Sequence, residues 1–219
     1  MDNFKPILAI ETSEMLCSCA LLLNENDFVE FNIRQKNIHS EKLMEMISTL
    51  FNNSEIELKD VGHIAISIGP GSFTGLRIGL SVAKGLAYGA DLPMVPVPNF
   101  DALALQISSY LEKDETFFVI NKANITESYV GRYQVMENYF KQIEEVKLVS
   151  TSELKKTIHK SDNIFGNFSE EDEKKIFSSP NAVYVGKWSY IFGKDLVTYN
   201  YDFLEPNYLK KFVVKVKND

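Results

Sequence analysis

Residues 64–90 read IAISIGPGSFTGLRIGLSVAKGLAYGA and join three kinds of local structure. The apolar residues at 64–68 predict a buried strand, and the Gly-Pro-Gly run at 69–71 interrupts regular structure. From Thr74, a predicted helix N-cap, apolar residues recur at helical spacing until Gly89, where we expect the helix to stop. The stretch therefore predicts a strand, a glycine loop and a helix in succession.

The loop after this strand has two interpretations, which the sequence leaves open. In the first, free backbone N–H groups and the positive end of the helix dipole bind a phosphate or a carboxylate, and a cation in the first helical turn supports this. In the second, the glycines only allow a tight turn between strand and helix. The spacing matches neither a Walker loop nor GxGxxG. The candidate anion-binding or nucleotide-binding residues are Glu11, Thr12, Gly69, Gly71, Ser72 and Arg77.

The helix after the loop carries small residues at four-residue intervals along one face. They are Gly75, Gly79, Ala83 and Ala87. Glycine inside a helix costs roughly 1 kcal/mol relative to alanine, so this row predicts the close approach of another backbone. The approaching segment is either the chain's own sheet or a helix of a partner. The residues alone slightly favour internal packing, since most such rows face a protein's own core.

Length and charge limit the classes of protein that fit. The chain has 219 residues, 45% of them hydrophobic, and a net charge of −7. A chain of this length and apolar content can form two lobes in contact. We expect residues 1–110 to form the first lobe and residues 111–219 to form the second. The negative charge lies almost entirely in the first of these, which argues against a direct grip on a nucleic-acid backbone.

Neither a membrane segment nor a secretion signal is predicted. No apolar run is long enough to span a bilayer, and the N-terminus lacks a basic segment followed by an apolar run, so we expect a cytoplasmic protein. Cys17 and Cys19 lie two residues apart in a predicted strand, where a disulfide would be strained and a zinc site would need more ligands. We expect both to be small buried side chains.

The two halves of the chain show a similar order of elements. Strands predicted in the first half form an antiparallel meander and span residues 6–12, 16–23 and 28–34. The elements predicted after it are a helix capped by Ser40, the unit at 64–90, an extended piece at 93–98 and a helix from about 99 to 111. In the second half, strands are predicted at 116–121, 128–136, 142–149, 163–165 and 182–185, and helices after 152 and at 169–177.

Several motifs occur in a fixed order along the chain. They are ILAIETS near the start, HSEKL at 39–43, GPGSFTGLRIG at 69–79, AKGLA at 83–87 and EPNYLK at 205–210. Together they resemble the TsaB family, also called YeaZ. The resemblance implies a two-lobed α/β fold like that of actin and Hsp70 (ASKHA), in which each lobe is a mixed sheet flanked by helices and the second lobe is degenerate.

The resemblance also implies a function. It implies a role in making threonylcarbamoyladenosine at adenosine 37 of tRNAs that read codons beginning with A. In that family the protein is the non-catalytic partner of a paralogue, TsaD, which transfers the threonylcarbamoyl group, and an ATPase, TsaE, joins them. The tRNA is then reached indirectly, and a homodimer through the same face is allowed when TsaD is absent.

The resemblance further implies which residues matter. It implies no catalytic residue, no metal and no cofactor in the isolated chain, with ATP or ADP binding only at the interface with partners. It favours the interpretation in which the small-residue row packs against a helix of a partner. The partner-binding residues that it implies are His39, Leu43, Met46, Ile47, Leu50, Gly75, Leu76, Gly79, Leu80, Ala83 and Ala87.

The residues themselves are compatible with a lack of catalysis. The hairpin at 11–14 has no glycine, and the hairpin at 121–124 has no acidic metal ligand, so the nucleotide site of an actin-like ATPase is incomplete. Asn99 and Leu103 occupy the places where TsaD-like sequences carry two metal-binding histidines. The alternative is an actin-like nucleotide-binding enzyme, an ATPase or a peptidase-like protein, whose own site includes Glu11, Thr12, Gly69, Gly71 and Ser72.

Overall fold

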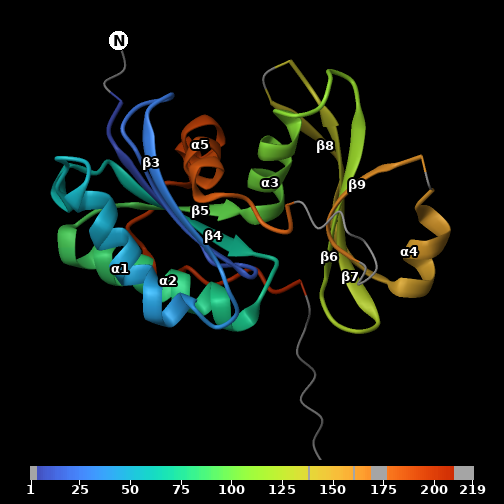
Figure 1. Ribbon diagram of the computed structural model, residues 1–219, viewed down its shortest axis with the longest axis horizontal. Coiled ribbons are helices and arrows are strands. Elements are labelled where there is room, and N and C mark those ends of the chain that lie inside the picture. The colour runs from blue at the N-terminus through green and yellow to red at the C-terminus, as the bar shows by residue number, and fades with distance from the viewer. Residues whose placement is uncertain (1–3, 138, 160, 169–176, 210–219) are drawn as a thin grey trace, which may run out of the picture.

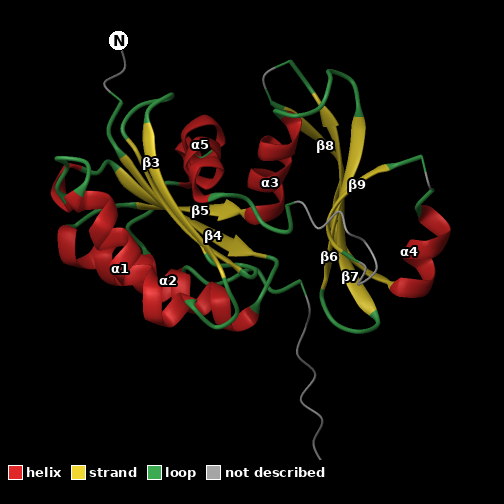
Figure 2. Cartoon of the chain, in the orientation of Figure 1, coloured by secondary structure: helices red, strands yellow, loops and turns green. Residues whose placement is uncertain are grey.

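The computed structural model describes residues 4–137, 139–159, 161–168 and 177–209. Two lobes lie side by side, each built on one mixed sheet (Figures 1 and 2). Within the described ranges, no helix has the length and apolar character needed to cross a membrane. Cys17 and Cys19 are both buried and unpaired, as predicted.

The first sheet has five strands in the order β3-β2-β1-β4-β5. The central strand β1 (Ile7–Glu11) pairs antiparallel with β2 (Leu16–Leu22) and parallel with β4 (His63–Gly69). The edges are β3 (Phe28–Arg34) and β5 (Met94–Pro98). Strands β1 and β4 are apolar along most of their length because both faces of the sheet are covered by helices. The predicted antiparallel meander is confirmed.

Within the described residues, four helices cover this sheet, two on each face. Helices α1 (His39–Asn52) and α2 (Phe73–Ala90) pack on one face through a core that includes alternate residues of β1 and β4. Helices α3 (Asn99–Ser108) and α5 (Ala182–Phe192) lie on the other face, between the two sheets (Figure 1). The outer surface of α1 and α2 therefore faces away from both sheets.

The second sheet repeats the arrangement of the first. Its order is β8-β7-β6-β9, with β9 parallel to β6 and the other pairs antiparallel. Its elements are β6 (Thr116–Lys122), β7 (Glu127–Val135), β8 (Phe140–Ser150), the helix α4 (Thr151–Thr157) and β9 (Asn163–Asn167). In both sheets a three-strand meander is followed by a helix and a strand parallel to the first. A counterpart of β5 is missing from the described part of the second sheet.

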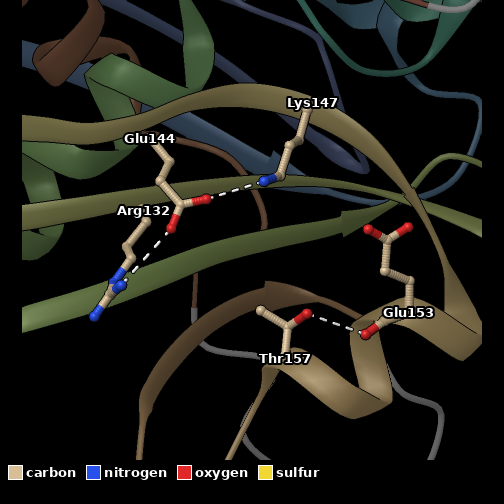
Figure 3. Close-up of polar contacts among 5 residues, drawn as sticks. All are labelled: Arg132, Glu144, Lys147, Glu153 and Thr157. Atoms are coloured by element: carbon tan, nitrogen blue, oxygen red, sulfur yellow. Dashed lines mark hydrogen bonds and ion pairs between the residues drawn. The ribbon is translucent and has the colours of Figure 1, made fainter.

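The β7–β8 edge carries a charged cluster on the side of α4 (Figure 3). Arg132 on β7 lies opposite Glu144 on β8, with its Nη1 3.7 Å from the carboxylate, and Lys147 Nζ lies 3.0 Å from the same group. Beside them, Thr157 Oγ1 donates to Glu153 O across one turn of α4. These charged side chains are largely solvated, so the pairs contribute little to stability.

Two predicted boundaries and one predicted strand are wrong here. Helix α1 follows Ile38, so Ser40 lies inside its first turn. Helix α2 continues through Gly89 and is ended by Asp91 in the left-handed conformation. The residues at 182–185 begin helix α5 and do not form a strand. The helix predicted at 169–177 falls largely outside the described residues.

The chain after α5 returns along the first sheet. Thr198 and Met94 exchange backbone hydrogen bonds of 2.8 and 2.9 Å, which pairs the chain with the edge strand β5. A 3-10 turn at Tyr201–Phe203 follows. We call residues 198–208 the C-terminal strap. Both α5 and the strap contact the first sheet, although they follow the second sheet in sequence. The lobe boundary at residue 110 therefore stays a prediction. It divides the strands of the two sheets, but α5 and the strap lie beyond it in sequence while contacting the first sheet.

Candidate functional site

The glycine loop links β4 to α2. Ser72 and not Thr74 is the N-cap of α2, because its Oγ accepts a hydrogen bond from Gly75 N at 3.2 Å. Gly69 has a φ of 103°, a left-handed value that favours glycine. The helix thus begins earlier than predicted, and the loop before it is shorter.

The hairpin between β1 and β2 closes on this loop. Ser72 N donates to Ser13 O at 2.6 Å, and Thr12 Oγ1 donates to Gly75 O at 2.8 Å. A Cβ on Gly71 would lie 2.5 Å from Ser13 O, so the hairpin can approach only because this residue is glycine. Of the two interpretations, the structure supports the tight turn, in which the glycines make room for the chain's own hairpin.

The charged members of the predicted anion-binding set also have partners within the chain. The Arg77 guanidinium lies 3.8 Å from the centre of the Phe73 ring, and its Nε donates to Tyr208 Oη at 3.2 Å. Glu11 is fully buried and accepts hydrogen bonds from the Ser67 hydroxyl and from the hairpin backbone. Intramolecular contacts thus involve Glu11, Thr12, Gly71, Ser72 and Arg77. Anion binding by this set, which also includes Gly69, stays a prediction.

Burial changes the acidity of the hairpin. It raises the pKa of Glu11 from 4.5 to about 7. It also raises the pKa of Glu14 to about 8, with a further contribution from the negative charge of Glu11. Both side chains therefore hold a proton over a range in which exposed glutamates are ionised. Among the described residues, no three His, Cys, Asp or Glu side chains gather as a metal site.

Asn99 has a structural role that the sequence did not reveal. Its Nδ2 donates to Ser13 Oγ and to Pro70 O, both at 2.9 Å, and the side chain is 1% exposed. It therefore ties the hairpin to the glycine loop. Leu103 belongs to the core between α3 and the second sheet. Neither residue offers an imidazole at this place.

The predicted partner-binding residues lie on the inner faces of α1 and α2. A Cβ on Gly75 would lie 2.1 Å from Thr12 O, and one on Gly79 would lie 2.2 Å from Thr12 Oγ1. His39 Nε2 lies 3.2 Å from Leu16 O. All members of the set are buried in this chain, so the structure corrects their orientation: the row packs internally, against the sheet and the hairpin. The set is His39, Leu43, Met46, Ile47, Leu50, Gly75, Leu76, Gly79, Leu80, Ala83 and Ala87.

The outer face of α2 carries a second row of small residues, which the sequence analysis missed. Ser81, Gly85 and Gly89 also follow one another at four-residue intervals, and all three are exposed. Apart from the neighbouring backbone of α2 itself, no described atom lies within 4 Å of a Cβ placed on Gly85 or on Gly89. Tyr88, which precedes Gly89 on α2, is 81% exposed, and Met44 on α1 is 51% exposed. The spacing could have revealed this row, but only the structure shows which row faces the sheet. We call Ser81, Gly85 and Gly89 the outer α2 row.

Three pockets meet at the first turn of α2. A groove of about 520 Å³ runs between α1 and α2 and is lined by Ser40, Phe73, Thr74, Arg77, Ile78, Ser81 and Val82. A second pocket of about 340 Å³ lies beside the hairpin and includes Glu14, Lys36 and His39. A third pocket, of about 420 Å³, lies between the lobes and is lined by Glu14, Gly71, Ser72, Phe73, Lys122, Ala123, Tyr129 and Tyr208. The first turn of α2 thus connects the helical face with the space between the lobes.

Comparisons with known proteins agree with this arrangement. A family model described as TsaD: tRNA N6-adenosine threonylcarbamoyltransferase matches residues 33–207. The tRNA threonylcarbamoyladenosine biosynthesis protein TsaB of Haemophilus influenzae is 31% identical, over 94% of this chain and 94% of that protein. The tRNA N6-adenosine threonylcarbamoyltransferase of Ehrlichia chaffeensis is 24% identical, over 55% of this chain and 39% of that protein.

A solved structure has the same fold. YeaZ from Pseudomonas aeruginosa superposes with a TM-score of 0.77 at 22% identity, covering 94% of this chain and all of that one. The predicted two-lobed α/β fold, with one mixed sheet in each lobe, is confirmed. The motifs that suggested the family lie at the hairpin, the start of α1, the glycine loop, α2 and the end of the strap. This chain belongs to the TsaB (YeaZ) family.

Proposed function

We propose that this chain takes part in the synthesis of threonylcarbamoyladenosine on tRNA, as the non-catalytic partner of a TsaD-type threonylcarbamoyltransferase. The full-length relative named for this biosynthesis supports the pathway. The weaker likeness to a threonylcarbamoyltransferase supports a pairing of paralogues, because two chains of one fold present related helical faces to each other. The modified nucleoside in this proposal is adenosine 37 of tRNAs that read codons beginning with A.

The closed hairpin supports the non-catalytic role. In an actin-like ATPase, the loops at this place hold the phosphates and a metal ion. Here Ser13 O accepts the hydrogen bond of Ser72 N, and the buried carboxyl group of Glu11 lies at the end of β1. A phosphate would have to displace the hairpin and would meet an acidic side chain.

In this proposal, the partner binds to the outer α2 row. Each exposed helical glycine costs roughly 1 kcal/mol relative to alanine, and no contact from the described chain to Gly85 or Gly89 offsets this cost. A partner helix lying against the row would gain the close backbone approach that small residues permit. The exposed ring of Tyr88, which precedes Gly89 on α2, would be buried by the same contact.

We also propose roles for the remaining components of the reaction. TsaE joins through the TsaB–TsaD assembly, tRNA is contacted indirectly, and the outer face forms a homodimer when TsaD is absent. The isolated chain needs no cofactor, and ATP or ADP binds only where the partners meet. The reaction takes place in the cytoplasm.

Binding of the TsaD paralogue from the same organism tests the proposal. Gly85→Leu places a large side chain on the outer α2 row, where it meets open space in this chain, so we expect a folded variant that no longer co-purifies with the paralogue. Ser152→Leu on α4 is the matched control, because it adds the same side chain to an exposed helix of the other lobe. Wild-type protein that does not bind the paralogue, or Gly85→Leu that binds as well as wild type, would contradict the proposal.

A further inference from the structure

The C-terminal strap follows α2 along its length. Just beyond the end of α2, Tyr201 Oη donates to Leu92 O at 2.6 Å. Just before its start, Asn207 N donates to Ile68 O at 2.7 Å. The strap at 198–208 thus contacts the chain at both ends of the helix. It belongs to the last part of the sequence, yet it borders the helix that the proposed function places against a partner.

At the start of α2, the strap ends in a cluster of three side chains. The Tyr208 ring lies 5.1 Å from the Phe73 ring, between centroids, and Arg77 Nε donates to Tyr208 Oη at 3.2 Å. The Arg77 guanidinium lies over the other ring at 3.8 Å. An arginine stacked on one aromatic ring and hydrogen-bonded to a second side chain has a restricted set of rotamers. We call Arg77, Phe73 and Tyr208 the clamp.

Two members of the clamp, Phe73 and Arg77, form one side of the groove between α1 and α2. Phe73 and Arg77 line this groove of about 520 Å³ together with the aliphatic side chains Ile78 and Val82. Ser81, the first residue of the outer α2 row, lines it as well. The groove is therefore continuous with the surface on which the proposed function rests. Its aliphatic and aromatic lining suits an apolar side chain.

We infer that the strap is a positioning element of the partner surface: Tyr208 holds Arg77 and Phe73 in the wall of the groove, which then receives an apolar side chain from a helix of the TsaD-type partner. This inference rests on the proposed function. Tyr208 and Arg77 act as positioning residues, because side chains that are ordered before binding lose less entropy when the partner arrives. Without the tyrosine, both groove residues gain freedom that binding must remove.

Titration calorimetry with the purified TsaD paralogue of the same organism tests this role. We expect Tyr208→Ala to raise the Kd about tenfold, since two long side chains must then be ordered on binding. Tyr208→Phe keeps the ring against Phe73 and loses only the hydroxyl, so we expect it to restore part of the affinity. Tyr199→Ala is the matched control. Tyr199 belongs to the same strap, is 59% exposed and lies outside the clamp, so its removal should leave the Kd unchanged.

A second variant keeps the test decisive if Tyr208→Ala lowers the melting temperature of the chain. Arg77→Leu removes the guanidinium from an exposed position of α2 and is expected to raise the Kd to a similar extent with the melting temperature retained. Wild-type protein that fails to bind the paralogue would contradict the proposed function itself. Wild-type binding, with an unchanged Kd in both Tyr208→Ala and Arg77→Leu, would overturn the role of the strap alone.

Discussion

Two glycines of α2, Gly79 and Gly85, have opposite surroundings. A Cβ on Gly79 would lie 2.2 Å from Thr12 Oγ1 and 3.3 Å from Ile66 Cδ1, whereas one on Gly85 would meet no described atom within 4 Å beyond the neighbouring backbone of α2. The inner glycine thus allows the hairpin to pack against the helix. The described chain makes no such contact with the outer glycine. The proposed function therefore places the partner on the outer face of α2.

Alanine substitutions at these two positions should change the free energy of unfolding in opposite directions. Gly79→Ala should lower the free energy of unfolding by about 1–3 kcal/mol, because the added methyl group forces Thr12 or the helix to move. Gly85→Ala should raise it by up to about 1 kcal/mol, since alanine is the better helix former and has room. Urea denaturation of the isolated chain measures both. A stabilising Gly79→Ala would show that the hairpin does not pack as described.

The hairpin carboxyl groups give the fold a dependence on pH. Both glutamates have a pKa of 4.5 when unfolded, and folding raises it to about 7 for Glu11 and about 8 for Glu14, mainly through burial. The folded state therefore binds these protons more tightly. Their contribution to stability is complete below pH 4.5 and is lost as the pH rises to about 8. His63 acts in the opposite direction, because burial lowers its pKa from 6.5 to about 4, so its contribution is complete above pH 6.5.

Between pH 6.5 and pH 8, the contributions of Glu11 and Glu14 to stability change with pH, whereas the contribution of His63 does not. We expect the free energy of unfolding to fall across this window in the wild-type chain, since the folded state must give up protons that the unfolded state no longer holds. In Glu14→Gln the fall should be smaller, because only Glu11 then titrates. Urea midpoints at the two pH values measure the difference. An equal fall in both proteins would exclude Glu14 as a source.

At the scale of elements, α5 shows what the sequence can and cannot predict. The β-branched residues near 182–185 favour a strand. The structure has a helix there because distant residues satisfy its first N–H groups: Ser18 Oγ accepts from Ala182 N and Glu30 Oε1 accepts from Val183 N, each at 2.8 Å. Capping by side chains so far away in sequence cannot be read from local patterns.

Other elements were predictable because their signals are local. Strands β1 to β5 and the repeated meander follow from alternating or continuous apolar runs, and the glycine loop from its composition. The orientation of α2 was not predictable in this way, because Gly75 to Ala87 and Ser81 to Gly89 both form rows of small residues at the same spacing. Only the register of the helix against the sheet distinguishes them.

The cap on α5 should be measurable. Glu30→Ala removes the acceptor of Val183 N and an acidic group at the positive end of the helix, so we expect a loss of about 1–2 kcal/mol in the free energy of unfolding. Glu45→Ala is the control, since that glutamate forms an exposed pair with Lys42 on α1 and should contribute under about 1 kcal/mol. Thermal unfolding of both variants provides the comparison. Equal stabilities would show that Glu30 does not cap α5.

At the scale of the whole molecule, the two lobes share one order of elements but differ in how their sheets are covered. The first sheet has helices on both faces and an outer helical surface, whereas the described part of the second sheet lacks a counterpart of β5. The lobes are joined where α3 packs against the second sheet, with Tyr133 Oη donating to Asp101 Oδ1 at 3.0 Å. A closed hairpin inside the molecule and an open small-residue row outside it support the proposed role as a partner protein.

Reconstituted modification of a tRNA transcript tests the central claim most directly. Purified TsaD, TsaE and the enzyme that supplies the activated threonylcarbamoyl group would be combined with the transcript, with wild-type chain, with Gly85→Leu or with no chain. We predict that threonylcarbamoyladenosine forms only with the wild-type chain, because the other two mixtures lack the helical contact with TsaD. Equal yields with and without this chain would contradict the account.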